Sequence, residues 1–319
     1  MARHNRPVAE LFSAACVGDR GALARLLSLI ERGADEARVI GRLSYSRGGR
    51  AFTVGLTGAP GAGKSTLTSA LIGHLRSQAL EVAVLAIDPS SPFTGGAILG
   101  DRVRMQDHAT DPGVFIRSMA TRGHLGGLSL STPEAIRLLD AVGREWILVE
   151  TVGVGQVEVE IAGKADTTVV VVNPGWGDSV QANKAGLMEI ADIFVINKSD
   201  RKGAAETRRD LEQMLELSDI AHDSWMPPIL ETVGTTGQGV VELWSAVLEH
   251  RQFITEHGVL SQRREFRLRE ELREIVARRL QQKARELCGG DRWDSLQEAV
   301  LQRQKDPWGA ADEMLSGLA

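Results

Sequence analysis

The sequence predicts an α/β fold in which a mostly parallel central sheet is flanked by helices, with a helical arm before it and a helical extension after it. Between residue 51 and about residue 250, short and continuously apolar runs alternate with stretches that repeat their apolar residues at helical spacing. Strands that are apolar along their whole length and separated by helices are typical of parallel sheets buried on both faces. On either side of this region, the apolar residues recur at helical spacing.

These patterns divide the chain into three expected domains: the arm at 1–48, the sheet domain at 49–250 and the extension at 251–319. The sheet domain is expected to contain seven strands, at 52–57, 82–87, 113–117, 146–151, 167–172, 192–196 and 228–232.

The arm is expected to be a helical hairpin. Its apolar residues between positions 8 and 32 follow a helical repeat that Val17–Gly21 interrupts, and a loop at 46–50 ends it. In the extension, the segment 262–285 holds nine Lys and Arg against four Glu and has an apolar stripe, which predicts a long amphipathic helix. The stripe consists of Leu268, Leu272, Ile275, Val276 and Leu280. Its basic face is either a solvated surface or a dimerisation or partner-docking arm.

Composition excludes several classes of protein. The formal net charge of −5 gives no electrostatic case for binding nucleic acid. The longest strongly apolar run, 167–172, is far too short to cross a bilayer, and the N-terminus lacks the core of a signal peptide. The two cysteines form no C-x-x-C pair, which suggests a reducing compartment. We therefore expect a cytoplasmic protein.

A glycine-rich turn, GAPGAGKST, follows the first expected strand and opens a helix. Gly58, Gly63, Lys64 and Ser65 fit the pattern G-x-x-x-x-G-K-[S/T] at every fixed position. In this motif the loop backbone and the helix N-terminus bind phosphates, the lysine reaches the β- and γ-phosphates, and the serine hydroxyl binds Mg²⁺. The sequence therefore predicts a P-loop NTPase fold that binds a nucleoside triphosphate through Gly58, Ala59, Pro60, Gly61, Ala62, Gly63, Lys64, Ser65 and Thr66.

The segment Asn197-Lys198-Ser199-Asp200 follows the sixth expected strand, about 130 residues after the P-loop. A carboxylate at position 200 can accept from both N1–H and N2–H₂ of guanine, a donor pattern that adenine lacks, and leaving such buried groups unpaired costs about 1–3 kcal/mol each. Asp200 is thus predicted to select GTP. We expect Asn197 to tie the base loop to the P-loop and the Lys198 stem to cover one face of the base. A third backbone contact to the base is expected after the last strand, at Val233, Gly234 and Thr235.

Three carboxylates are candidates for binding the metal ion and the attacking water. Asp88 and Glu150 each end an expected strand, and Asp101 lies in a glycine-rich stretch. A strand-end carboxylate is costly to bury without a partner, and Mg²⁺ with its waters is a natural one. Helix capping or a buried ion pair is the alternative. Gly153 could bring its backbone N–H close to the γ-phosphate.

Phosphoryl transfer to water depends on positioning and on neutralising charge. We expect Lys64, Glu150 and Asp101 to take part in catalysis, with Lys64 and Mg²⁺ offsetting the charge at the β,γ-bridge. The residue after Gly153 is Val154, and a valine side chain cannot orient a water molecule. We therefore expect slow intrinsic GTP hydrolysis that a partner accelerates.

At this point the sequence resembles a known family. The segments GAPGAGKST, IDPSSPFTGGAILGDRVRM, VETVGVGQVE and VVVVNPGWGDSVQANKAGLMEIADIFVINKSD are similar to MeaB/ArgK-type G proteins of the SIMIBI class, and the resemblance covers essentially the whole chain. These proteins accompany adenosylcobalamin-dependent acyl-CoA mutases, chiefly methylmalonyl-CoA mutase. The resemblance implies a homodimeric GTPase chaperone that couples its nucleotide state to loading of cobalamin into the mutase, and that protects the mutase from inactivation.

The resemblance also implies roles for particular residues. The positions that surround the Mg-nucleotide in the family match Lys64, Ser65, Asp88, Asp101 and Glu150. The segment matching 174–184 acts as a switch that relays nucleotide state to the mutase, with Asp178, Gln181 and Lys184 at its polar positions. From the residues alone, without the family, Asp178 is equally well interpreted as a helix N-cap rather than as a switch residue. Trp176 stands where relatives usually carry a small or aliphatic residue, and it is either a partner anchor or cover for the core.

Three other functions stay open. A metal-delivery GTPase of the same class needs clustered Cys or His ligands, and the seven scattered His and two distant Cys show no ligand spacing. A kinase acting on an amino-acid transport protein is disfavoured by the guanine-selecting Asp200, because protein kinases use ATP. The third is a regulatory switch with a different client, since the sequence does not identify the client.

Overall fold

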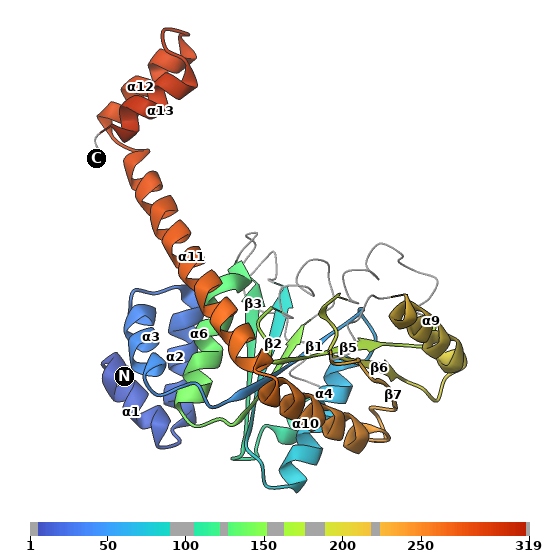
Figure 1. Ribbon diagram of the computed structural model, residues 1–319. Helices are drawn as coiled ribbons and strands as arrows, with labels where there is room; N and C mark the ends of the chain where they lie inside the picture. The colour runs from blue at the N-terminus through green and yellow to red at the C-terminus, as the bar shows by residue number, and fades with distance from the viewer. Residues whose placement is uncertain are drawn as a thin grey trace. The chain divides into compact units, whose positions relative to one another are not determined.

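The computed structural model describes residues 6–89, 105–121, 127–151, 163–175, 189–217 and 224–316. Its centre is a seven-stranded sheet of order β3-β2-β4-β1-β5-β6-β7, in which each neighbouring pair is parallel (Figure 1). The strands are β1 (Phe52–Thr57), β2 (Val82–Pro89), β3 (Val114–Thr121), β4 (Trp146–Thr151), β5 (Thr167–Val172), β6 (Ile193–Asn197) and β7 (Ile229–Thr232). The predicted fold class and all seven predicted strands are confirmed, with ends that differ by up to four residues.

The middle of the sheet is buried on both faces. Every residue of β1, β4 and β5 is buried, including the polar residues near the strand ends, as expected for parallel strands that helices cover on both faces. Because all strands run in the same direction, their carboxyl ends meet at one edge, and the P-loop leaves β1 at that edge.

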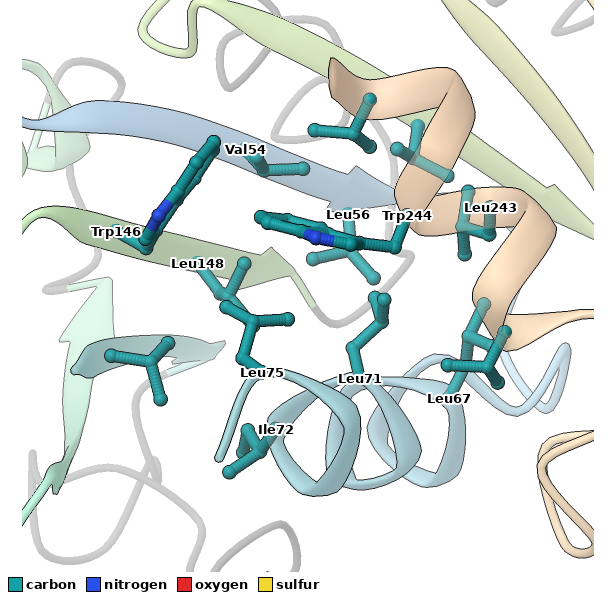
Figure 2. Packing of buried hydrophobic residues seen from close by; sticks show 14 of the residues in the cluster. Val54, Leu56, Leu67, Leu71, Ile72, Leu75, Trp146, Leu148, Leu243 and Trp244 are labelled. Atoms are coloured by element: carbon teal, nitrogen blue, oxygen red, sulfur yellow. The ribbon is translucent and has the colours of Figure 1, made fainter. Parts of the chain in front are cut away.

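One face of the sheet is covered by α4 (Lys64–Ser77) and α10 (Val240–Glu256). Leu67, Leu71 and Leu75 recur along α4 at helical spacing and point toward the sheet (Figure 2). Trp244 of α10 packs edge-on against Trp146 of β4, with ring centroids 4.5 Å apart. The helix that begins in the P-loop is thus held by an apolar core.

The opposite face is covered by α6 (Gly127–Ala141) and by the N-terminal arm, while α9 (Ala204–Glu216) packs on β5 and β6. The arm holds α1 (Val8–Cys16), α2 (Arg20–Arg32) and also α3 (Glu36–Tyr45), so the expected helical hairpin is a three-helix arm. The sequence pattern missed α3 because its buried face is small, with Ala37, Ile40 and Ser44 as its buried residues.

A last long helix, α11 (Val259–Leu287), is attached to the amino edge of the sheet through its first turns. Two aspartates precede β5 and β6 there. Arg264 binds Asp166, with Nη2 and Oδ2 2.7 Å apart, and Arg263 binds Asp192, with Nη2 and Oδ1 2.9 Å apart. Arg267 also binds Asp166.

Charge pairing outweighs burial at both carboxyl groups. Burial by itself raises the pKa of Asp166, but hydrogen bonds and charge from Arg264 and Arg267 hold that pKa below its ordinary value. For Asp192, burial likewise raises the pKa, and His250 and Arg263 bring it below the ordinary value. These ion pairs are therefore charged at neutral pH.

The chain divides into two compact units, residues 1–267 and 268–319. The second unit contains the rest of α11, α12 (Asp291–Leu301) and α13 (Pro307–Leu315), with a small core of Leu296, Ala310 and Met314. The predicted amphipathic helix is present, and its stripe faces solvent in this single chain: Leu272 is 62% exposed and Leu280 is 61% exposed. Among the described residues, no helix is both long enough and apolar enough to span a membrane.

Candidate functional site

The P-loop connects β1 to α4 and depends on its glycines. Gly58, Gly61 and Gly63 have φ of 132°, 75° and 92°, values that favour glycine. Two of them also lie against neighbouring groups. A Cβ on Gly58 would lie 1.9 Å from the carbonyl oxygen of Val171, and a Cβ on Gly63 would lie 2.4 Å from Asn197 Nδ2. The spacing of the motif is therefore a steric requirement of this fold.

Lys64 opens α4 with its side chain folded into the loop. It is 6% exposed, and its Nζ donates to the carbonyl oxygens of Gly58 at 2.6 Å and Ala59 at 3.0 Å. An ammonium group held here adds to the positive end of the α4 dipole, which suits the binding of phosphate.

Ser65 and Glu150 lie together although they are 85 residues apart. Ser65 Oγ donates to Glu150 Oε1 at 2.6 Å, and the two residues are 6% and 2% exposed. Strand pairing explains the contact, because β4 lies beside β1 with Leu56 paired to Glu150. A hydroxyl and a carboxylate oxygen at the N-terminus of a phosphate-binding helix are hard ligands that fit Mg²⁺.

The other predicted metal ligands are only partly described. The backbone of Asp88 lies at the carboxyl end of β2, next to β4, since Ile87 pairs with Thr151. The side chain of Asp88 lies outside the description. Asp101, Gly153, Trp176, Asp178, Gln181 and Lys184 also lie outside the described residues.

Asn197 joins three loops at the carboxyl edge of the sheet. Its Nδ2 donates to the carbonyl oxygen of Ala62 at 2.8 Å in the P-loop. Its Oδ1 accepts from Thr232 Oγ1 at 3.1 Å and from the backbone N–H of Gly234 at 3.0 Å. The side chain is 2% exposed, so these bonds satisfy an amide that would otherwise be buried at a cost.

The residues that follow Asn197 extend toward solvent. Lys198 has a φ of 60°, and its Nζ donates to the carbonyl oxygen of Gly61 at 2.6 Å, so its stem runs from the β6 end to the P-loop. Asp200 is exposed. This places an accessible carboxylate three residues beyond the amide that touches the P-loop.

In the loop after β7, two of the three backbone N–H groups expected near the base are engaged elsewhere. Val233 N–H donates to the carbonyl oxygen of Gln238 at 3.0 Å, and Gly234 N–H donates to Asn197. A backbone contact from this loop to a base would therefore come from Thr235, which is exposed.

Sequence patterns did not reveal Thr232 as a partner of Asn197. It is the last residue of β7 and is fully buried, but its position next to Asn197 follows from the pairing of β6 with β7. Thr232 follows the charged Glu231 in the short strand β7, so the apolar pattern of the strand gave no signal for its buried role. Among the described residues, no group of three or more His, Cys, Asp or Glu could hold a metal ion.

Comparison with known proteins agrees with this geometry. A family model described as "Methylmalonyl Co-A mutase-associated GTPase MeaB" matches residues 23–288. A protein of Pyrococcus horikoshii named "Putative GTPase" is 52% identical over 312 residues, with 97% of this chain and 98% of that protein covered. The "GTPase ArgK" of Escherichia coli is 38% identical over 257 residues, with 78% of this chain and 77% of that protein covered.

Two further matches concern a mammalian relative and a solved structure. The mouse "Methylmalonic aciduria type A homolog, mitochondrial" is 34% identical over 280 residues, with 82% of this chain and 68% of that protein covered. A solved structure described as "Crystal structure of LAO/AO transport system kinase" aligns with a TM-score of 0.71 and 26% identity, over 100% of this chain and 99% of that one.

Proposed function

The chain belongs to the family of methylmalonyl-CoA mutase-associated GTPases, and on that premise we propose that it is a GTP-hydrolysing chaperone for an adenosylcobalamin-dependent acyl-CoA mutase. It is a GTPase of the P-loop class. The observation that carries the nucleotide-binding part of the proposal is the Asn197–Ala62 hydrogen bond, because it joins the glycine-rich loop directly to the strand end that leads to Asp200.

We assign the following roles within the site. Lys64 leaves the loop carbonyls to bind the β- and γ-phosphates, and the loop backbone between Gly58 and Thr66 binds their oxygens. Asp200 accepts from N1–H and N2–H₂ of guanine, and the Lys198 stem covers one face of the base.

Ser65 and Glu150 would hold Mg²⁺ with the nucleotide, with Asp88 and Asp101 as further candidate ligands. The metal ion supplies charge that offsets the developing negative charge on the phosphates. Gly153 is proposed to donate its backbone N–H near the γ-phosphate. Glu150 is buried, and its Oε1 accepts from Ser65 Oγ.

The client is proposed from the family and from the mouse relative, whose printed name refers to methylmalonic aciduria. We propose that GTP and GDP states alternate while cobalamin is loaded, and that Asp178, Gln181 and Lys184 transmit the state to the mutase. Intrinsic hydrolysis is proposed to be slow and to be accelerated by the client. We also propose a cytoplasmic homodimer, with the exposed α11 stripe as a candidate surface for the second copy or for the client.

The test is a binding and rate experiment with purified methylmalonyl-CoA mutase. We expect the mutase to be retained by this protein in a nucleotide-dependent way and to raise the rate of GTP hydrolysis. Lys64→Ala is the matched control, since it should abolish hydrolysis and keep the fold. Absence of binding in the GTP, GDP and nucleotide-free states, together with an unchanged rate, would overturn the mutase proposal.

A second candidate function is a kinase acting on an amino-acid transport protein, because the solved structure with a TM-score of 0.71 is described as a transport system kinase. Incubation with γ-labelled GTP or ATP and a candidate acceptor distinguishes the two. Phosphate released to water supports the chaperone GTPase, whereas label transferred from ATP to the acceptor supports the kinase.

A further inference from the structure

Two buried threonine hydroxyls meet where β1 and β4 end. Thr57 is 0% exposed and Thr151 is 1% exposed. Thr151 Oγ1 donates to Thr57 Oγ1 at 3.2 Å and also lies 3.5 Å from the carbonyl oxygen of Leu56. Thr57 directly precedes Gly58, the first P-loop residue, and Thr151 directly follows Glu150. Each hydroxyl is thus one residue away from one half of the nucleotide site.

The threonine pair lies on the opposite face of the sheet from the Ser65–Glu150 contact. Leu56 and Glu150 are partners in the β1–β4 register, and Leu56 points toward α4 and α10 (Figure 2). Successive side chains of a strand point to opposite faces. Val149 accordingly packs in the cluster with α6, on the face that Thr57 and Thr151 share. The end of β4 is therefore held on both faces, by Glu150 to α4 and by Thr151 to β1.

The backbone pairing of β1 with β4 does not extend to this point, although Thr151 is still paired to Ile87 of β2 and Thr57 to Val170 of β5. The β1–β4 ladder runs from Phe52–Trp146 to Leu56–Glu150 and ends there. The next pair in register is Thr57 with Thr151, which is joined through side-chain hydroxyls. This bond continues the attachment of β4 to β1 by one residue beyond the ladder, at the position where the P-loop begins.

We propose that the Thr57–Thr151 hydroxyl pair is a positioning contact for catalysis, which fixes the carboxylate of Glu150 relative to the P-loop. The pair touches neither nucleotide nor metal, and it acts through Glu150 and Ser65. Catalytic groups need to be held within about 0.5 Å of their working geometry, and a misplacement of about 1 Å can cost about 100-fold in rate. The inference rests on the GTPase activity of the proposed function, and it adds to that function two residues outside the P-loop and base motifs.

The experiment uses the full chain with Thr151→Val, which keeps the β-branched shape and removes the hydroxyl. We expect kcat for GTP hydrolysis to fall about 10- to 100-fold, with GDP affinity within about twofold of wild type. In the presence of GDP, Tm is expected to rise with the Mg²⁺ concentration. Thr151→Val should need a higher Mg²⁺ concentration than wild type to reach half of this rise. Thr151→Ser restores a hydroxyl and should recover most of both properties.

Thr53→Val is the matched control. Thr53 lies on β1, on the same face as Thr57, and is buried; its hydroxyl accepts from the backbone N–H of Asp166 at 2.9 Å. It lies at the far end of the strand from the P-loop. This variant should lower Tm and leave kcat and the Mg²⁺ dependence unchanged.

Thr57→Val tests the same contact from the other strand and serves if Thr151→Val fails to fold. It should reproduce the loss in kcat. Where the double variant Thr57→Val/Thr151→Val folds, its fold-decrease in kcat should be smaller than the product of the two single decreases. The proposal is overturned if Thr151→Val or Thr57→Val hydrolyses GTP at the wild-type rate, if Thr53→Val loses as much activity, or if Thr151→Ser gives no recovery. A wild-type protein that fails to hydrolyse GTP would instead contradict the proposed function.

Discussion

Asn197 Nδ2 donates to the carbonyl oxygen of Ala62 across 2.8 Å, so that the end of β6 is bonded directly to the P-loop. The same side chain accepts from Thr232 and Gly234. One amide therefore fixes the relative positions of three loops.

Asn197→Ala should lower both stability and nucleotide affinity. The substitution removes the partner of a buried hydroxyl and of a backbone N–H, which costs about 1–3 kcal/mol of unfolding free energy. Urea unfolding and GDP titration measure the two effects. Gln252→Ala is the control, because its amide is exposed and bonds Glu256 on the same helix. Equal effects of the two substitutions would contradict the linking role of Asn197.

Gly63→Ala should weaken GDP binding about 100-fold or more, which corresponds to at least about 2.7 kcal/mol. A Cβ at position 63 would lie 2.4 Å from Asn197 Nδ2, so the loop or the amide must move. Gly61→Ala is a control within the same loop. Gly61 also has a positive φ, but a Cβ there would meet no described atom within 4 Å. The loss of GDP-binding free energy in Gly61→Ala should therefore be limited to the backbone strain, about 1–2 kcal/mol. Equal losses at the two positions would show that strain alone accounts for the result.

Asp200→Asn should shift the base specificity of the nucleotide site from guanine toward xanthine. The amide can donate to a base oxygen but cannot accept from both guanine donors, so GTP affinity should fall about 10- to 100-fold and xanthosine triphosphate should bind better. Competition binding with GTP, ATP and xanthosine triphosphate measures this. Since Asp200 is exposed, Tm without nucleotide should hardly change. Unchanged affinity for GTP would remove the assignment of Asp200 to the base.

Most of the sheet could be predicted from the sequence, because strands such as 146–151 and 167–172 each contain a run of four consecutive apolar residues. Helix α3 could not, since Gly41 and a small buried face weaken its apolar repeat. For the candidate site, local motifs predict Lys64, Ser65 and Asp200, and their roles stay proposals. Glu150 was recognisable as a carboxylate at a strand end.

The pairing of these groups required the strand order. Ser65 meets Glu150, and Thr57 meets Thr151, because β4 inserts between β2 and β1. Nothing local in the sequence specifies that neighbour. For the same reason, the sequence pattern does not predict that Asp166 is buried beneath arginines that lie about 100 residues later in the chain.

Asp166→Asn should destabilise the protein in a pH-dependent way. Asp166 is nine-tenths buried or more and binds Arg264 and Arg267 from α11. Removing its charge leaves two guanidinium groups without this partner, and breaking a buried pair in this way costs about 3–5 kcal/mol, at the lower end here because both arginines are partly exposed.

The sign of the pH effect follows from the lowered pKa of Asp166. Burial raises this pKa, but hydrogen bonding to Arg264 and the charge of Arg267 hold it below the ordinary value in the folded state. The unfolded chain therefore binds the proton more readily. The stabilisation is fully present above the unfolded pKa, near pH 4, and is lost as pH falls through the folded pKa.

The difference in unfolding free energy between wild type and Asp166→Asn should thus narrow from pH 6 to pH 3, as measured by urea unfolding. Asp35→Asn, at an exposed residue before α3, should show a small difference at both values. A gap for Asp166→Asn that widens toward pH 3 would mean that the carboxyl is protonated in the folded protein.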